Sequence, residues 1–448
     1  MAAVTTWTGR EANALRQALR MSVTGFADHL GAARRTVAKW SSQGNKVHLR
    51  ADMQAALDTV LARATPDVRE RFGALVSAGS SGALADPATL PVRGTHIHTG
   101  EGGIHDFDSD GDVRRRDLLT GVTISGITLP NVATLLEALV SPRPRNTEPV
   151  ALPIRQFGRD VADAKIAYQA CHYEQVLARL VALLPALEPT CADAEGEQRA
   201  QVDALASDLY HVVGSVLLKV GDKGMALVAA ERSTRAAASS QDPLAMAASA
   251  RIMTHALMSN GHSNQARQLA EAAAETLRRG TGLASTDAIA VYGALLLRGA
   301  IAAARDDNRD NAQAMLDEAA HAADRLGYDG NDRWTGFGAA NVLLHRVNIA
   351  LTLGDAGTAI TLARQVPLDK IGLAERKASL FVDVARAYIQ WGRYEHGLNA
   401  LRSAYEIAPE EIRCRPAVQR IAGDLAVLTR GHVRSAVFDF AQHVGIHV

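Results

Sequence analysis

Apolar residues recur every three or four positions through most of the chain, and this spacing places them on one face of an α-helix. The pattern is present within residues 8–63 and returns near Asp112, from where it runs, with a break at 141–146, to Val448. Residues 77–112 lack it and are rich in Gly, Ser, Asp and His, a composition typical of linkers. We therefore expect four segments: a helical domain over 1–75, a flexible linker over 76–112, a helical connector over 113–150 and a long helical domain over 151–448.

The N-terminal segment predicts four short helices. Thr8 and Glu11 fit a capping box, in which the Thr hydroxyl and the Glu carboxylate satisfy free N–H groups at the start of a helix. A second helix ends at a tight turn that Gly31 supplies, and a third follows from about Ala33. The fourth is expected over His48–Ala62, where apolar residues recur every four positions.

The long C-terminal segment repeats one unit, which consists of a helix, a short turn and a second helix. Successive turns are about 38 to 48 residues apart. A single hairpin has an apolar face that it cannot bury alone, so stacking on neighbouring hairpins is required. The predicted turns lie at Gly221-Asp222, Gly261-His262, Arg305-Asp306, Gly354-Asp355 and Gly392-Arg393.

The composition agrees with this pattern. Apolar residues make up 47% of the 448 residues but aromatic residues only 4%, so Ala, Leu and Val fill the interior. Small aliphatic side chains suit closely packed helical layers, and this balance disfavours a β-rich fold. We expect an all-α protein.

The last hairpin resembles the tetratricopeptide repeat. Only Gly397 stands where that family usually has a small Ala. The resemblance extends more loosely over about residues 160–448, and it implies a solenoid in which the first helix of each unit lines a concave groove. The residues at the signature spacing are Phe381, Val384, Ala385, Tyr388, Gly392, Tyr394, Leu401, Ala404 and Pro409.

The N-terminal domain resembles the lambda-repressor/Cro-like helix-turn-helix family, often called XRE. The resemblance rests on Leu15-Arg16, Ser22, Phe26-Ala27, Leu30-Gly31, Val37 and Trp40. In that family the second helix of the motif lies in the major groove of DNA. The chain departs from the family at Thr24, where Gln is common, and at Ala32-Ala33, where a capping Ser is usual. Carried onto this sequence, the resemblance implies DNA contacts from Thr24, Arg34, Arg35, Thr36 and Lys39, with Lys46 as a further phosphate contact.

The distribution of charge favours a polyanionic partner for this domain. The whole chain has 48 Lys and Arg against 48 Asp and Glu, whereas residues 1–72 hold 11 against 6. The N-terminal domain is therefore basic and the remainder mildly acidic, which is typical of a nucleic-acid-binding module on a larger body. The alternative is that Arg34, Arg35 and Lys39 form an ordinary solvated helix face.

The tetratricopeptide resemblance also directs polar residues into the groove. Asn341, His345 and Asn348 follow one another at i, i+4 and i+7, so they form a single polar stripe on a helix. An Asn amide both donates and accepts hydrogen bonds and so matches a peptide backbone. The alternatives are a chance polar lining or hydrogen bonds between helices. The candidate effector-binding residues are His211, Arg251, His255, Asn341, His345, Asn348, Arg386 and Gln390, with Asp208 and Ser215 on the same inward face.

A helix-turn-helix followed by tetratricopeptide repeats is similar to the quorum-sensing regulators of Gram-positive bacteria. That resemblance implies a sequence-specific regulator of transcription that binds double-stranded DNA, forms a homodimer through its repeats and senses a peptide or small-molecule effector. The alternative is a protein-interaction scaffold whose helix-turn-helix does not read DNA.

Other kinds of chemistry receive less support. Asp106, Asp108, Asp110 and Asp117 follow the ligand order of an EF-hand calcium loop. However, the segment before them is no entering helix, and Arg114–Arg116 add positive charge, so an acidic linker is the favoured interpretation. The chain lacks the usual motifs of nucleotide-binding proteins, zinc proteases and serine hydrolases. We expect no enzyme activity and no cofactor.

The cysteines and the character of two weakly apolar segments favour a cytoplasmic protein. The three cysteines form no C-x-x-C pair, which fits a reducing compartment. Met1–Arg20 lacks the apolar block of a signal peptide. The weakly apolar run over 118–140 contains Gly, Pro and Glu, unlike a membrane span.

Overall fold

A computed structural model describes residues 51–78, 129–140, 150–446 and 448, together with 7–19, 21, 23–30, 32, 36–37, 39–40, 44, 47 and 49. The chain divides into two compact units. The first contains residues 1–105 and 424–434, and the second contains 106–423 and 435–448. Within the described residues the structure is helical and contains no β-strand, so the predicted all-α fold is confirmed.

The first unit is a small helical bundle. Its helices are α1 (Gly9–Ala18), α2 (Val23–Leu30), α4 (Ala51–Arg63) and α5 (Pro66–Ala78). The Thr8 side chain accepts a hydrogen bond from the Arg10 N–H, and Glu11 accepts one from the Thr8 N–H, so the predicted capping box is present. The expected fourth helix begins at Ala51 rather than at His48. The sequence analysis missed α5, which continues past residue 75 into the stretch assigned to the linker.

Apolar side chains from each of these helices share one core. Its largest members are buried aromatic residues, and Trp7 stacks on Phe72 with ring centroids 5.6 Å apart. The Trp7 indole N–H donates to Asp58 Oδ1 at 2.7 Å, so its polar group is satisfied as well. The helical positions Val37 and Trp40 are buried in the same core.

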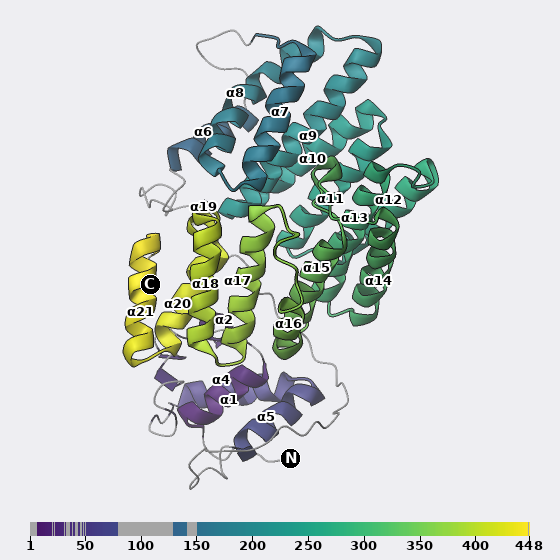
Figure 1. Cartoon of the computed structure of the whole chain (residues 1–448). Helices are drawn as coiled ribbons and strands as arrows, with labels where there is room; N and C mark the ends of the chain where they lie inside the picture. Colours follow the sequence, from purple (N-terminus) through teal and green to yellow (C-terminus); the bar gives the residue numbers. More distant parts are fainter. Residues whose placement is uncertain are drawn as a thin grey trace. The chain divides into compact units, whose positions relative to one another are not determined.

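The second unit is a solenoid of helical hairpins (Figure 1). Helix α6 (Leu129–Val140) and the short helix η2 (Asp332–Trp334) lie outside the hairpin pattern. After the last hairpin come α19 (Pro409–Cys414), α20 (Pro416–Leu428) and α21 (Gly431–Val444), of which residues 424–434 belong to the first unit. The six hairpins are α7 (Ile154–Gln169) with α8 (Tyr173–Ala192), α9 (Gly196–Val220) with α10 (Lys223–Ser240), α11 (Pro243–Ser259) with α12 (Ser263–Thr281), α13 (Thr286–Arg305) with α14 (Arg309–Leu326), α15 (Ala339–Thr352) with α16 (Ala356–Ala363), and α17 (Ala374–Gln390) with α18 (Tyr394–Ile407).

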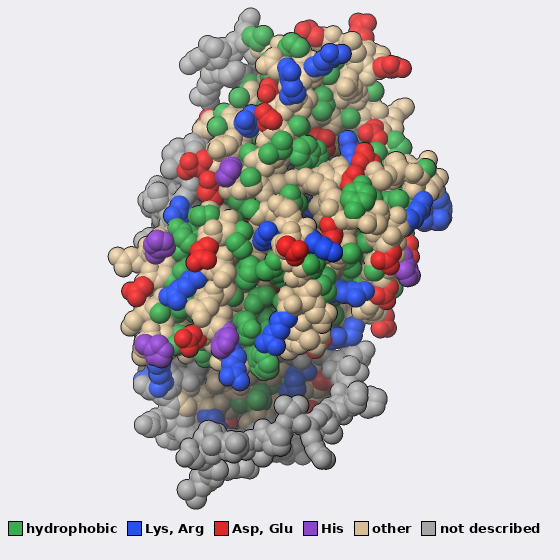
Figure 2. Space-filling model, viewed as in Figure 1, with side chains coloured by type: hydrophobic (Ala, Val, Ile, Leu, Met, Phe, Trp, Pro, Cys, Tyr) green, Lys and Arg blue, Asp and Glu red, His purple; other side chains and the backbone are tan. Residues whose placement is uncertain are grey.

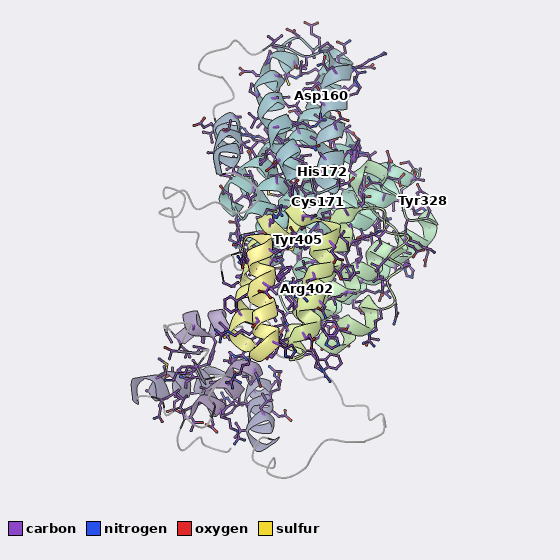
Figure 3. All side chains as sticks on the ribbon, turned by 60° about the vertical axis from the view of Figure 1, so that its left-hand side comes forward. Asp160, Cys171, His172, Tyr328, Arg402 and Tyr405 are labelled. Carbon is purple, nitrogen blue, oxygen red and sulfur yellow. The ribbon has the colours of Figure 1, made fainter. Side chains whose placement is uncertain are left out.

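All five predicted turns fall inside hairpins of this array. Gly221 shows why: it takes the left-handed conformation (φ 88°) that ends α9, and Asp222 then caps α10 by accepting from the Met225 N–H at 3.0 Å. A sixth turn, between α7 and α8, was missed. There Cys171 adopts φ 63° and is followed by His172, without the Gly that marks most of the other turns (Figure 3).

The first helices of successive hairpins pack on one another. Helix α7 contacts α9, and the series continues through α11, α13 and α15 to α17. The array also closes on itself, because α17 contacts α7 and α19 contacts α9. Buried residues of the last elements, Ala378, Ala408 and Cys414, belong to the same core cluster as Phe157 of α7 and Tyr173 of α8.

Among the described residues, two helices are long and apolar enough to cross a membrane by length and composition, α8 and α13. The apolar window of α13 is 89% buried, because neighbouring helices surround it, and this is the usual position of a core helix. Acidic and basic side chains are interspersed over the face of the array seen in Figure 2. This face therefore carries no large area of a single charge.

Candidate functional site

A polar cavity of about 250 Å³ lies within the repeat array, inside the second unit. The first helix of each hairpin, from α7 to α17, contributes to its wall. Since these helices pack side by side and the second helices lie behind them, polar residues on their inner faces converge. Arg333 and Trp334 of the loop before α15, with the start of α20, complete the lining.

Positive charge dominates this lining. Nine Lys and Arg side chains face three carboxylates, a balance opposite to that of the mildly acidic repeat region as a whole. The cations are Lys165, Lys219, Arg251, Arg298, Arg305, Arg333, Arg376, Arg415 and Arg420, and the carboxylates are Asp208, Glu375 and Asp383.

The two lysines are already paired within the chain. Lys165 Nζ lies 2.7 Å from Asp208 Oδ2, yet burial outweighs this partner and lowers the pKa of Lys165 to about 8. Lys219 Nζ lies 2.8 Å from Glu375 Oε1 and 2.7 Å from Glu411 Oε1. Burial alone would lower the pKa of Lys219, but the two carboxylates reverse this effect and raise it above its usual value.

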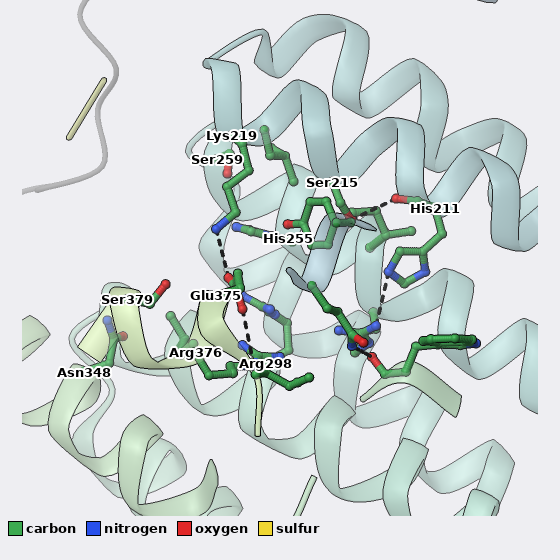
Figure 4. Close-up of a pocket in the computed structure, with 18 of the residues that line it drawn as sticks. His211, Ser215, Lys219, His255, Ser259, Arg298, Asn348, Glu375, Arg376 and Ser379 are labelled. Carbon is green, nitrogen blue, oxygen red and sulfur yellow. Dashed lines mark hydrogen bonds and ion pairs between the residues drawn. The ribbon is translucent and has the colours of Figure 1, made fainter. Parts of the chain in front are cut away.

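Three arginines from three helices lie close enough in the cavity for their charges to oppose one another. Arg251 comes from α11, and Arg298 of α13 and Arg376 of α17 are labelled in Figure 4. Burial and neighbouring cations lower the pKa of Arg251 to about 10 and that of Arg298 to about 9. Both remain cationic at neutral pH. The Arg376 guanidinium is 3.6 Å from Glu375, a carboxylate that it shares with Lys219.

Two histidines beside these cations are held neutral. Burial, then Arg251, lowers the pKa of His211 well below its usual value, and burial with Arg376 and Arg298 lowers that of His345 to about 3. Arg251 can only donate, so at 3.2 Å His211 Nε2 accepts its hydrogen bond. His345 Nδ1 donates to the Asn341 carbonyl oxygen at 2.8 Å, which leaves its Nε2 as an acceptor.

The two asparagines of the predicted polar stripe differ in their partners. Asn348 donates from Nδ2 to Asp383 Oδ2 at 2.9 Å, so it makes the kind of hydrogen bond between helices that was the alternative interpretation. Asn341 Oδ1 is buried and accepts no hydrogen bond within the described residues. Such an acceptor is costly to bury alone and is a natural point of contact for a ligand that donates.

The structure brings together most of the predicted groove residues. His211, Arg251, His255, Asn341, His345 and Asn348 line the cavity, as do Asp208 and Ser215. Two predicted residues do not line it. Arg386 lies 3.5 Å from Asp383 in an ion pair on α17, and Gln390 is the last residue of that helix. Both lie too far toward its C-terminal end, because the cavity meets α17 at residues 375–383.

The predicted DNA-contacting residues are only partly described. Thr24 lies in α2, Thr36 is half-buried, and Lys39 is exposed beside the buried Trp40. Arg34, Arg35 and Lys46 lie outside the described residues, as do Asp106, Asp108, Asp110 and Asp117 of the candidate calcium loop. Within the described part of the chain, no three His, Cys, Asp or Glu residues gather as metal ligands.

Sequence reasoning missed Arg298, Arg376 and Trp334. Helix α13 is apolar on nearly every side, so its periodicity does not identify an inner face. The isolated charge of Arg298 in the middle of this apolar helix was the available signal. Trp334 lies in a loop that no helical register covers, and the Lys165 ammonium lies 5.6 Å from its ring centroid.

No protein-family model and no curated protein matches this chain. It is similar to solved structures of helical-repeat proteins at low identity. A thermophilic TPR protein of Thermus thermophilus is 20% identical over 49% of this chain and 99% of that one, with a TM-score of 0.34. A Rap protein complexed with Competence and Sporulation Factor is 14% identical over 90% and 98%, with a TM-score of 0.44. The APC/C hetero-tetramer Cut9-Hcn1 is 12% identical over 96% and 95%, with a TM-score of 0.34.

These scores are too low to carry a function over to this chain. They lend no support to the predicted helix-turn-helix regulator.

Proposed function

We propose that this protein is a helical-repeat binding protein that holds a peptide segment, free or part of a partner protein, in the cavity of its repeat array. The observation that carries the proposal is the convergence of polar side chains from six first helices on one cavity. A solenoid core needs apolar inner faces only where helices touch. Polar residues at inner-face positions where helices do not touch are therefore available to a ligand.

The size and chemistry of the cavity support a segment of peptide. Pockets for drug-sized molecules have volumes of about 300–1,000 Å³, so a cavity of about 250 Å³ admits one or two side chains of a longer ligand. Its wall offers donors on arginines and acceptors on Asn341 and His345. A peptide backbone carries both complementary groups in every residue.

Retention of peptides by the full-length chain tests this proposal. The immobilised protein is incubated with a random hexapeptide library, and the retained peptides are counted by mass spectrometry. Ser215→Trp fills the cavity from α9 and is expected to reduce retention at least tenfold. Ala272→Trp, on the exposed side of α12, is the matched control and should retain the wild-type set.

Circular dichroism checks that both variants keep their helical content, and Ser259→Trp repeats the block from α11. The proposal is wrong if the wild type retains no peptide above a blank surface. It is equally wrong if Ser215→Trp and Ser259→Trp both fold, so that the new side chain fills the cavity, and yet retain the same peptides as the wild type.

A second candidate function is sequence-specific DNA binding by the first unit, coupled to ligand binding in a homodimer. One observation favours it: Val37 and Trp40 are buried in the bundle core while Lys39, between them, is exposed. This is the pattern of a helix that packs on one side and is exposed to solvent on the other. Arg34 and Arg35 belong to the same predicted recognition helix.

A gel shift with duplexes from the upstream region of the gene tests the second candidate. Wild type should shift one fragment in preference to unrelated duplexes, and Arg34→Ala with Arg35→Ala should abolish that preference. Lys39→Ala should weaken all duplexes alike, since a phosphate contact reads no sequence. Equal binding of every duplex by all variants would contradict this function and leave the binding protein as the better description.

A further inference from the structure

The cavity has more positive charge than the chain itself neutralises. Its carboxylates are engaged: Asp208 with Lys165, Glu375 with Lys219, and Asp383 with Asn348. Glu411 lies behind the wall and pairs with Lys219 and Arg415. The guanidinium groups of Arg251, Arg298 and Arg376 therefore lie near carboxylates that are already shared, Glu375 with Lys219 and, beside Arg251, Asp208 with Lys165.

The hydrogen bonds of these arginines are also incomplete. Arg298 makes no hydrogen bond or ion pair with the described residues. Arg251 Nε is buried without a partner, and this side chain has the neutral His211 as an acceptor. Like charges held together in a desolvated site destabilise one another, and an unmet buried donor adds to the cost. Both deficits disappear when an oxyanion enters.

The geometry of the donors specifies the kind of anion. A guanidinium presents its N–H groups in a planar fork, which matches the two oxygens of a carboxylate or two oxygens of a phosphate. Acceptors line the same cavity, namely Asn341 Oδ1 and His345 Nε2. An acidic peptide supplies the oxyanion and, within the same few atoms, the backbone N–H groups that those acceptors need. Inorganic phosphate at neutral pH has one or two O–H donors, but they lie on the same small ion as its oxyanion, whereas a peptide spaces its N–H donors away from its carboxylate.

We infer that Arg251, Arg298 and Arg376 form an anion subsite that receives a side-chain carboxylate of an acidic peptide. This inference rests on the proposed function, since it specifies the ligand of the same cavity. Arg298 is the central residue of the subsite because it lies between the other two along the series of first helices and has no partner among the described residues. In the ligand-free protein Arg298 lowers the free energy of unfolding, and its role is to bind the carboxylate of the ligand.

Calorimetric titration of the full-length chain with two C-terminally amidated hexapeptides, one of glutamate and one of glutamine, tests the inference. The peptides share a backbone and differ only in side-chain charge. The glutamate peptide is expected to bind at least tenfold more tightly. Arg298→Gln should remove this difference, Arg298→Lys should retain part of it, and Arg278→Gln on the exposed face of α12 should leave it unchanged.

Thermal unfolding separates a binding role from a structural one. Because Arg298 is a desolvated cation beside other cations, Arg298→Gln is expected to keep or raise the melting temperature while it lowers affinity for the glutamate peptide. A loss of binding that accompanies a lower melting temperature would mean that Arg298 supports the fold instead, and would overturn the inference.

The remaining outcomes are also decisive. Equal affinity for the two peptides, or no binding of the glutamate peptide, overturns the acidic subsite. If the hexapeptide library is still retained in the cavity, the proposed function survives that result. Inorganic phosphate is titrated separately, and if it binds as tightly as the glutamate peptide and depends equally on Arg298, the ligand is a phosphate and the assignment to a peptide carboxylate is wrong.

Discussion

At the scale of single residues, the cavity is built from side chains whose protonation is set by one another. His345 is neutral because burial and the cations Arg376 and Arg298 oppose its charged form. Of the two lysines in the cavity, Lys165 loses its proton more easily, because the desolvation of its ammonium exceeds the attraction of Asp208 and lowers its pKa. Each of these shifts connects the geometry of the cavity to a measurable dependence on pH.

The stability of the repeat array should fall in mild acid through His345. In the unfolded chain this imidazole takes up a proton near pH 6.5, but in the native state only near pH 3. Protons therefore bind preferentially to the unfolded state, so the stabilisation is complete above about pH 6.5 and is lost as the pH falls. At pH 5 the loss from this one residue is about 2 kcal/mol.

Urea unfolding at pH 7 and pH 5, followed by circular dichroism, measures that loss. His345→Asn keeps a polar side chain but cannot titrate, so it should show a smaller decrease between the two pH values. His321→Asn is the control, since His321 is exposed on α14. An identical decrease in wild type and His345→Asn would contradict the assignment.

Affinity for an acidic peptide should fall at alkaline pH through Lys165. Above its pKa of about 8 the ammonium becomes neutral, and Asp208 is left as an unpaired carboxylate that repels an anionic ligand. At a separation of about 10 Å and an effective dielectric constant of about 20, one charge contributes about 1.7 kcal/mol, which is over tenfold in affinity. Titration of the glutamate hexapeptide at pH 7 and pH 8.5, which lies above the pKa of Lys165 but below the pKa of about 9 of Arg298, should show part of this fall. Lys165→Met combined with Asp208→Asn should flatten it, and a fall of the same size in that double variant would exclude Lys165 as its source.

At the scale of elements, the loop between α14 and α15 brings Arg333 and Trp334 to the cavity. Both residues have positive φ, 48° and 62°, a conformation that L-residues seldom adopt. Three contacts hold it. Asn331 and Gln169 exchange amide hydrogen bonds, which ties the loop to α7. Asp329 Oδ1 accepts from the Ala340 N–H at 2.8 Å, and the fully buried ring of Phe337 lies over Gly293 of α13.

The Phe337–Gly293 contact predicts a non-additive pair of substitutions. A Cβ at Gly293 would come within 1.9 Å of the Phe337 ring, so Gly293→Ala should destabilise the wild type by about 1–3 kcal/mol through overpacking. Phe337→Ala should cost about 3–5 kcal/mol. In the Phe337→Ala background the clash is absent, and Gly293→Ala should be neutral or stabilising because Ala favours a helix by about 1 kcal/mol. Urea unfolding of all four proteins gives the coupling energy, and strictly additive costs would contradict this packing.

The elements also show how far the sequence could predict the structure. Five of the six hairpin turns were predictable because Gly and short polar residues end helices for local reasons. The inner faces of α9, α11 and α15 followed from the register of the tetratricopeptide resemblance, which is why His211, Arg251 and Asn341 were found. Helix α13 is buried on nearly all sides, so periodicity did not single out Arg298. Gly397 departs from the repeat signature because a Cβ there would lie 2.9 Å from Ile389, a contact visible only once α17 and α18 are packed.

At the scale of the second unit, closure of the array creates the cavity. The last elements, α17 and α19, return to the first hairpins through an ion cluster in which Lys219 of α9 meets Glu375 and Glu411. Lys219 and Glu411 are 192 positions apart in the sequence. Such a pairing depends on the small rotation between each hairpin and the next, summed over the whole array. Local sequence patterns do not contain that sum, so neither the closure nor the cluster was predicted.

Removal of Lys219 should therefore open the array as well as destabilise it. Lys219→Met keeps most of the aliphatic volume but leaves the fully buried Glu411 with less compensation, at a cost of about 3–5 kcal/mol. Arg309→Met is the matched control: it breaks the pair between Arg309 and Asp355, whose side chains are 49% and 38% exposed, and should cost under about 1 kcal/mol.

Hydrogen exchange should rise in α7–α9 and in α17–α19 together in Lys219→Met, because the two ends of the array lose their contact. It should change only locally, near α14 and α16, in Arg309→Met. If exchange in Lys219→Met rose in α9 alone, the ion cluster would be a local feature of that helix, and closure of the array would depend on the apolar contacts of Ala378, Ala408 and Cys414 instead.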